Sequence, residues 1–178
     1  MKQCFFLIVI VLFAVACNNT PATPDAAAAE TKKEMPAMPM MPTYSSDFSI
    51  GNYDYAKMIV QGSWKDWQDN TMDNMKSWIA DTITVLQSNE KMIKGADSLI
   101  ANWKRGRASY TSIIDTVNAV VPVYSNDKKE NWVLVWATEI NTDMKGVKDT
   151  VNFMETWRIN KDGKADMVFQ YDRNQRKE

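Results

Sequence analysis

Apolar residues recur at helical spacing between residues 53 and 80. They lie at Tyr55, Met58, Ile59, Trp64, Trp67, Met72, Met75, Trp78 and Ile79. One face of an α-helix repeats every 3.6 residues, so this stripe predicts amphipathic helices. The turn Lys94-Gly95 is followed by Asp97, a residue that can cap a third helix carrying Leu99, Ile100 and Trp103 on one face.

The remainder of the chain alternates between apolar and other residues, which indicates β-strands. A short strand is expected over residues 81–86, and longer ones over residues 110–124, 132–140, 151–159 and 167–171. Polar turns separate the long segments, and Asn160 to Gly163 is a strong hairpin signal. On the last strand, Met167, Phe169 and Tyr171 form the apolar face. Helices followed by a strand meander predict an α+β domain with its helices on one face of the sheet.

The N-terminus has a different pattern. Lys2 precedes an unbroken apolar run from Phe5 to Val15, and small residues lead to Cys17. This pattern is typical of a secretory signal, and the run is shorter than the roughly 20 residues that a membrane-spanning helix needs. The cysteine after small residues resembles the bacterial lipobox, although Ala14 stands where leucine is commoner. The resemblance implies a lipid on Cys17 that anchors the chain in the cell envelope, and the Asn18-Asn19 pair favours the outer membrane. Ordinary secretion, with an incidental Cys17, is the alternative.

The chain therefore divides into four expected parts: a signal sequence (1–16), lipidated Cys17 with a tether (17–46), a folded domain (47–173) and a charged tail (174–178). The tether is rich in Ala, Pro and Thr, a composition that buries too little apolar surface to fold. Its segment Met35–Pro42 is either a plain linker or a set of thioether ligands for Cu(I).

Composition narrows the functions of the folded part. The formal net charge of −1 argues against nucleic-acid binding, which needs a basic surface. The chain contains no histidine, which excludes a Ser-His-Asp triad and the usual zinc hydrolases. Acid–base chemistry would then fall to carboxylates, Tyr or Lys, and we expect no cofactor and no metal.

Several local patterns resemble those of the nuclear transport factor 2-like (NTF2-like) superfamily, in particular its SnoaL-like domains. The matching segments are Ala80–Val85, Lys94–Leu99, Asn131–Trp136, Glu155–Lys164 and Gln170–Asp172. The resemblance implies a cystatin-like cone fold, in which three helices pack in the concave face of a curved, mixed, mainly antiparallel six-stranded sheet. Members often dimerise through the open sheet face, so we expect a homodimer. The superfamily includes isomerases, dehydratases and cyclases as well as binding domains without activity.

Three residues are candidates for chemistry. Glu155 shares a strand face with apolar neighbours, where burial would raise its pKa toward the range that is useful for proton transfer. Tyr171 could donate a hydrogen bond to an oxyanion. Asp81 stands where, by the resemblance, isomerases carry a base. Each also has a structural interpretation: a strand-rim carboxyl, a core aromatic residue and a capping residue.

A second set of residues is expected to line a pocket: Trp64, Trp78, Trp136, Trp157 and Asp115. Tryptophans at this spacing also suit a plain core, and Asp115 also suits an exposed position. Three functions therefore remain open. They are a membrane-tethered domain that binds a small apolar molecule without catalysis, an isomerase-, cyclase- or hydratase-type enzyme, and a structural lipoprotein that binds a partner or dimerises through its sheet.

Overall fold

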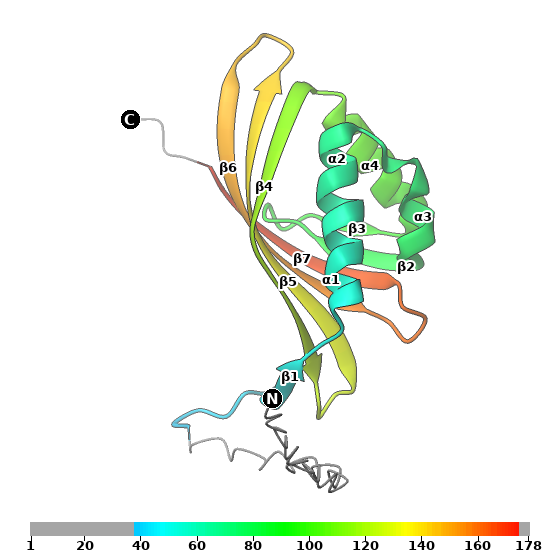
Figure 1. Cartoon of the computed structure of the whole chain (residues 1–178), viewed down its shortest axis with the longest axis vertical. Helices are drawn as coiled ribbons and strands as arrows, with labels where there is room; N and C mark the ends of the chain where they lie inside the picture. Colours follow the sequence, from blue (N-terminus) through cyan, green and yellow to red (C-terminus); the bar gives the residue numbers. More distant parts are fainter. Residues whose placement is uncertain (1–37, 175–178) are drawn as a thin grey trace, which may run out of the picture. The chain divides into compact units, whose positions relative to one another are not determined.

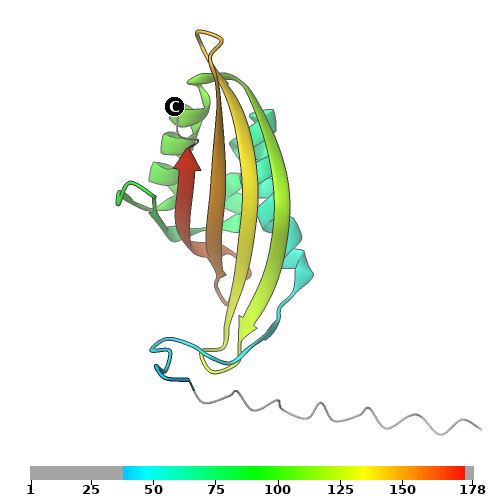
Figure 2. The ribbon, with the colours of Figure 1, turned by 90° about the vertical axis from the view of Figure 1, so that its left-hand side faces the viewer.

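The computed structural model describes residues 38–174, in which one mixed sheet of seven strands carries helices on its concave side (Figures 1 and 2). The expected signal sequence, Cys17, most of the tether and the tail after Asn174 lie outside the described residues. The strands are β1 (Phe48–Ile50), β2 (Ile79–Leu86), β3 (Met92–Lys94), β4 (Tyr110–Ser125), β5 (Glu130–Asp143), β6 (Lys148–Ile159) and β7 (Ala165–Asn174).

Strands β4 to β7 form the predicted antiparallel meander, and the sheet order is β1-β4-β5-β6-β7-β2-β3. Strand β2 pairs in parallel with β7, which makes the sheet mixed. The expected α+β class is confirmed. Seven strands are present where the resemblance implied six, because the short strand β1 pairs with the end of β4.

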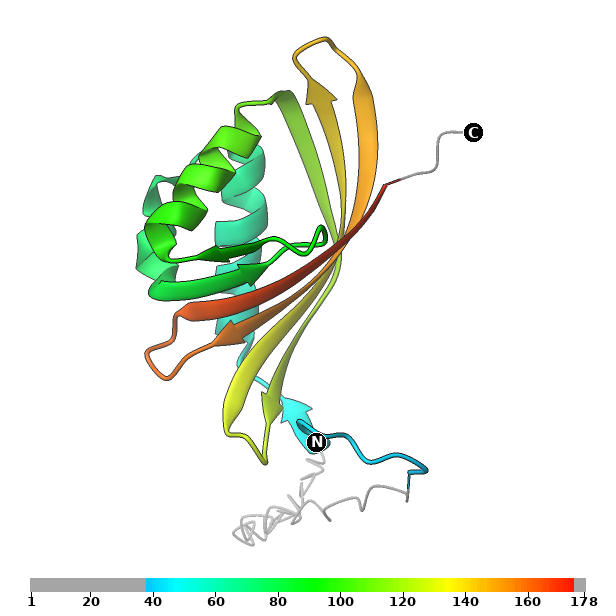
Figure 3. The same cartoon turned by 180° about the vertical axis from the view of Figure 1, so that it is seen from behind.

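The first helical region is one continuous helical rod, drawn in cyan and teal in Figures 1 and 3, whose middle segment is π-helical. Helix α1 (Tyr53–Ile59) continues into a π-helical segment (Val60–Lys65) and then into α2 (Asp66–Asp69). Asn52 starts the rod by accepting a hydrogen bond from the backbone N–H of Asp54 at 2.8 Å, and Asn70 ends it in the left-handed conformation.

Two further helices complete this layer. A 3₁₀ turn (Met72–Asn74) leads into the short α3 (Met75–Trp78), and α4 spans Ala96–Arg107. Gly95, with φ of 86°, occupies the cap position of α4. Asp97 therefore lies in the first turn instead of capping the helix, where its negative charge still suits the positive end of the helix dipole. None of the helices within residues 38–174 is long and apolar enough to cross a bilayer.

The hydrophobic core lies between the helices and the concave face of the sheet. Its members include Ile59, Met75, Trp78, Ile83, Val85, Leu99, Val133, Val135, Trp157 and Val168. Strand β4 contributes to it on both sides of an irregularity, where Val117 pairs with Ala137 but Ala119 pairs with Trp136. The extra residue reverses which alternate positions face inward. Asp115 and Val117 therefore share the concave face with Val120, whereas Ala119 does not.

The outer face of the sheet is also apolar, and here the structure differs from the expectation. Trp136 and Tyr171 both pair with Met154 of β6. Met154 precedes the buried, inward-facing Glu155, so Met154 and its two partners lie on the outer face. Tyr171 is 59% exposed. The apolar side of β7 that contains Tyr171 is therefore turned away from the helices.

Candidate functional site

A cavity of about 290 Å³ lies between the helices and the inner face of the sheet. The helices contribute three indoles to its lining, and strands β5 to β7 contribute two carboxyls and an amide. Its lining consists of Ser63, Trp64, Trp67, Gln87, Asn102, Trp103, Gly106, Ser109, Tyr110, Glu139, Phe153, Glu155 and Gln170. An engineered apolar cavity of about 150 Å³ binds benzene, so this cavity is large enough for a bicyclic molecule.

The π-helical segment places two of the lining residues. It carries the buried Ser63 and Trp64, both of which face the cavity. The same segment contains Gly62, where an added Cβ would lie 2.4 Å from Cε2 of Trp78. A side chain at residue 62 would therefore clash with that indole. The absence of a side chain lets the rod approach Trp78 closely while Trp64 turns into the cavity.

Glu155 is the most deeply buried acid in the cavity wall, with 2% of its surface exposed. Its carboxyl accepts a hydrogen bond from Nε1 of Trp157 at 2.9 Å and another from Nε2 of Gln170 at 2.9 Å. Burial raises the pKa of Glu155 to about 7, whereas these two hydrogen bonds oppose the rise and the negative charge of Glu139 adds to it. The carboxyl therefore changes charge near neutral pH.

Glu139 is a second buried acid in the same wall, with 5% of its surface exposed. It accepts hydrogen bonds from Nε1 of Trp67 at 2.7 Å and from Nδ2 of Asn141 at 3.1 Å. Tyr110 lies in the wall as well, and burial together with the charge of Glu139 raises the pKa of its phenol. Tyr110 therefore remains a hydrogen-bond donor at neutral pH.

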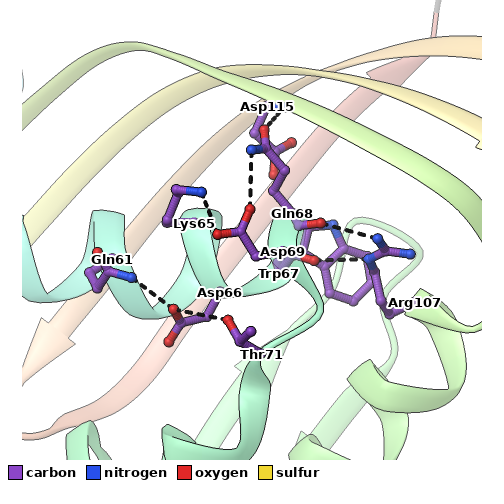
Figure 4. Close-up of polar contacts among 9 residues, drawn as sticks. All are labelled: Gln61, Lys65, Asp66, Trp67, Gln68, Asp69, Thr71, Arg107 and Asp115. Carbon is purple, nitrogen blue, oxygen red and sulfur yellow. Dashed lines mark hydrogen bonds and ion pairs between the residues drawn. The ribbon is translucent and has the colours of Figure 1, made fainter.

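Asp115 lies beside these acids without lining the cavity. It pairs directly with Glu139 across β4 and β5, and its backbone N–H donates to Oε1 of Gln68 at 2.8 Å (Figure 4). Both carboxyl oxygens of Asp115 are buried and have no hydrogen-bond partner among the described residues. Burial, with the negative charges of Glu139 and Glu155, raises the pKa of Asp115 to about 7, and Arg107 opposes this rise.

Arg107 is the buried cation nearest to these acids, and backbone carbonyls surround it. Its guanidinium donates to the carbonyls of Trp67 at 2.9 Å, Gln68 at 3.1 Å and Tyr110 at 3.1 Å. Figure 4 shows the first two of these contacts, where α4 meets the end of α2. Arg107 thus ties the end of the long rod to α4 and to the start of β4.

The structure brings only part of the predicted site together. Trp64 and Glu155 line the cavity, whereas Trp78 and Trp157 pack in the core. Asp81 is exposed on β2. Within residues 38–174 no group of three or more His, Cys, Asp or Glu side chains is arranged to hold a metal ion.

Tyr171 borders a separate, open groove of about 530 Å³ on the outer face of the sheet. The groove is lined by Tyr44, Phe48, Val123, Trp132, Leu134, Thr156, Phe169 and Tyr171. The rings of Tyr44 and Trp132 meet edge to face in this lining, at 6.3 Å between centroids. Tyr171 and Glu155 therefore lie on opposite sides of the sheet.

Sequence reasoning did not single out Glu139, Tyr110, Trp67 or Gln170, which also line the cavity. A signal for Glu139 was present, since it alternates with Val133, Val135 and Ala137. The opposite face of β5 gives the stronger signal, because it carries the larger side chains of Trp132, Leu134 and Trp136.

Comparison with solved structures identifies the architecture. The structure matches an NTF2-like protein of unknown function from an Exiguobacterium species with 18% identity and a TM-score of 0.52, over 67% of this chain and 96% of that chain. It matches a SnoaL-like protein of unknown function from Burkholderia thailandensis with 11% identity and a TM-score of 0.53, over 70% and 99% of the two chains. The chain has an NTF2-like fold.

The NTF2-like fold also occurs in an LEH-like epoxide hydrolase from M. tuberculosis, which matches with 12% identity and a TM-score of 0.54, over 67% of this chain and 84% of that chain. No protein-family model matches the sequence, and no curated protein matches it significantly. At these identities the likeness shows the NTF2-like fold alone, so function has to be argued from the cavity.

Proposed function

We propose that this chain is a membrane-tethered domain of the SnoaL-like type that binds a small amphipathic molecule in the cavity between its helices and sheet. The observation that supports the proposal is the cavity itself. Its volume of about 290 Å³ is lined by three indoles and a phenylalanine together with carboxyl, amide and hydroxyl groups. An apolar wall with a few converging polar groups is the usual form of a ligand site.

A cavity-filling variant tests this proposal. Gly106 lines the cavity from α4. A Cβ added at this residue would lie 3.6 Å from Cη2 of Trp67, which is an ordinary contact distance. The longer side chain of Gly106→Leu would fill cavity space without straining the helix. Ala101→Leu is the matched control, because Ala101 is exposed on the same helix.

Isothermal titration with naphthalene-2-methanol, a neutral bicyclic alcohol, is the measurement. We expect one molecule to bind to the wild-type chain and to Ala101→Leu, and binding to be lost in Gly106→Leu. Equal binding by all three proteins would place the probe elsewhere and contradict the proposal.

A specific observation favours catalysis as a second candidate. A carboxyl with a pKa of about 7 in a cavity wall is suited to proton transfer in an isomerase, cyclase or hydratase. Glu155 or Asp81 was the expected base and Tyr171 the expected oxyanion donor, and of these three residues only Glu155 lies in the cavity wall. Binding therefore remains the favoured function. If the wild-type chain turns over a bound ligand and Glu155→Gln does not, catalysis becomes the favoured function.

The anchor and the oligomeric state are further parts of the proposal. Lipid on Cys17 would hold the domain at the envelope membrane, most simply the outer membrane. The exposed aromatic rings of Phe48 and Tyr171 on the outer face of the sheet suit a contact between two copies. Light scattering after size exclusion tests the dimer, which Tyr171→Glu should dissociate. A monomeric wild-type domain at high concentration would exclude it.

A further inference from the structure

The cavity wall contains two acidic side chains and no cationic side chain. Glu139 and Glu155 both line it, each at least nine-tenths buried, and none of its lining residues is a lysine or an arginine. Each of the two carboxyls accepts one hydrogen bond from an indole and one from a side-chain amide. A carboxylate has about four acceptor sites, so both retain acceptor capacity toward the cavity.

The nearest buried cation does not neutralise these acids at close range. Arg107 directs its guanidinium to three backbone carbonyls. Asp115, on the neighbouring strand, adds a third carboxyl whose oxygens have no hydrogen-bond partner among the described residues. Three carboxyls and one guanidinium therefore share this region, and a positive charge within the cavity would improve its electrostatic balance.

The aromatic rings of the same cavity lining also suit a cation. The rings of Trp67 and Trp103 meet edge to face at 6.2 Å, and those of Trp64 and Phe153 do so at 5.6 Å. Indole faces attract cations, most strongly where water is excluded. Trp64 is 5% exposed, and its Nε1 makes no well-aligned hydrogen bond within residues 38–174, although the Trp64 side chain interacts with Glu155 and lowers the pKa of that carboxyl. An ionised Glu155 would be a better acceptor for this donor than a neutral one.

We propose that the cavity selects an amphipathic cation, namely a primary amine on an aromatic or similarly flat apolar body, with its ammonium group directed to Glu155 and Glu139. This inference rests on the proposed function, because it requires that the cavity binds a ligand at all. It adds the charge and chemical class of that ligand, which neither the fold nor the comparisons supply.

Binding of such a cation would be linked to pH. Glu139 on β5 and Asp115 on β4 interact electrostatically with Glu155, and Arg107 on α4 interacts with Asp115. Because burial raises the pKa of Glu155 to about 7, a cation that needs the carboxylate must displace a proton at lower pH. From pH 8 to pH 6 the ionised fraction falls about tenfold, so affinity for the amine should fall by about the same factor. Asp115, whose pKa is also raised to about 7, would add to this fall.

Three indoles that differ mainly in charge form the test: tryptamine, tryptophol and indole-3-acetate are titrated calorimetrically into the wild-type domain. At pH 8 we expect tryptamine to bind at least about tenfold more tightly than tryptophol, from a charge-assisted hydrogen bond and the cation–π contact. Indole-3-acetate should bind most weakly.

Two isosteric variants locate the effect. Glu155→Gln and Glu139→Gln should each reduce tryptamine affinity about tenfold more than they reduce tryptophol affinity. Both are expected to fold, because the amide partners Gln170 and Asn141 can rotate to present an oxygen to the new NH₂ group. Glu90→Gln, the same change at an exposed turn residue, is the control and should have no effect.

The outcomes separate the two proposals. Equal affinity for the amine and the alcohol, or a preference for the acid, overturns the cation inference and leaves the binding function standing. The same holds if naphthalene-2-methanol binds and none of the indoles does. If neither the alcohol probe nor any of the indoles binds, both proposals fail.

Discussion

Replacing Glu155 with glutamine should flatten the dependence of folding stability on pH. The carboxyl is buried in the native state, where its pKa is raised from 4.5 to about 7. Below pH 4.5 it is protonated in both the folded and the unfolded chain, so it creates no pH dependence there. As pH rises from 4.5 toward 7, the carboxyl ionises in the unfolded chain while it stays protonated in the folded one. The free energy of unfolding therefore falls until the native carboxyl also ionises near pH 7.

The size of the effect follows from the shift. At about 1.4 kcal/mol per pKa unit, a rise of the pKa from 4.5 to about 7 lowers the free energy of unfolding by about 3 kcal/mol in full. Between pH 5 and pH 8 we expect about 2–3 kcal/mol of this loss. Glutamine carries no charge, so the variant avoids it. The variant should therefore approach wild-type stability at pH 5 and exceed it at pH 8.

Urea denaturation followed by tryptophan fluorescence measures both proteins at pH 5, 6, 7 and 8. The raised pKa of Asp115 gives a trend of the same sign, but that residue is present in both proteins and largely cancels in their difference. Glu90→Gln controls for the loss of one acid and should follow the wild-type curve. Parallel pH curves for wild type and Glu155→Gln would refute the reasoning, since they would mean that Glu155 has the same pKa in the folded and unfolded chain.

Three other outcomes are expected. Gly62→Ala should lower the free energy of unfolding by about 1–3 kcal/mol, because its Cβ would overlap the Trp78 indole. Gly106→Ala, the control, should be neutral or slightly stabilising. Urea midpoints that fall equally in the two variants would contradict this expectation. Arg107→Met should destabilise the domain by about 3 kcal/mol in the same assay, because three buried carbonyls lose their donor; a change below the assay error would show that water replaces the guanidinium. Cys17→Ser should move the chain from the detergent phase to the aqueous phase of a Triton X-114 partition, and an unchanged distribution would remove the proposed lipid anchor.

The fold could be predicted largely from periodicity. Two features were missed for local reasons. Strands β1 and β3 have three residues each, too few to establish an alternation. The irregularity after Val117 reverses the inward positions of β4, and a repeat of two cannot reveal an inserted residue. The α+β class survives both omissions, because neither changes the meander or the side on which the helices pack.

The site was harder to predict because both faces of the sheet are apolar. On β7, Phe169 and Tyr171 form the more hydrophobic face, yet Val168 and Gln170 are the residues that face inward. Periodicity separates the two faces of a strand but does not say which one the helices cover. On β6 the apolar neighbours of Glu155 do indicate the inward face, because Trp157 on that same face is fully buried.

Indole chemistry links the core to the site. A buried Trp N–H needs an acceptor, and the acids of the cavity wall supply one to Trp157 and to Trp67. That need alone does not require a carboxyl, since the side-chain oxygen of glutamine accepts the same bond without a charge. Above neutral pH, ionisation of the buried Glu155 lowers the free energy of unfolding by about 3 kcal/mol, a loss that glutamine would avoid. A more stable Glu155→Gln variant with reduced amine affinity would give that cost a functional reason, as expected where stability is traded for activity. A variant that gained stability and kept its amine affinity would leave the carboxyl at this position without one.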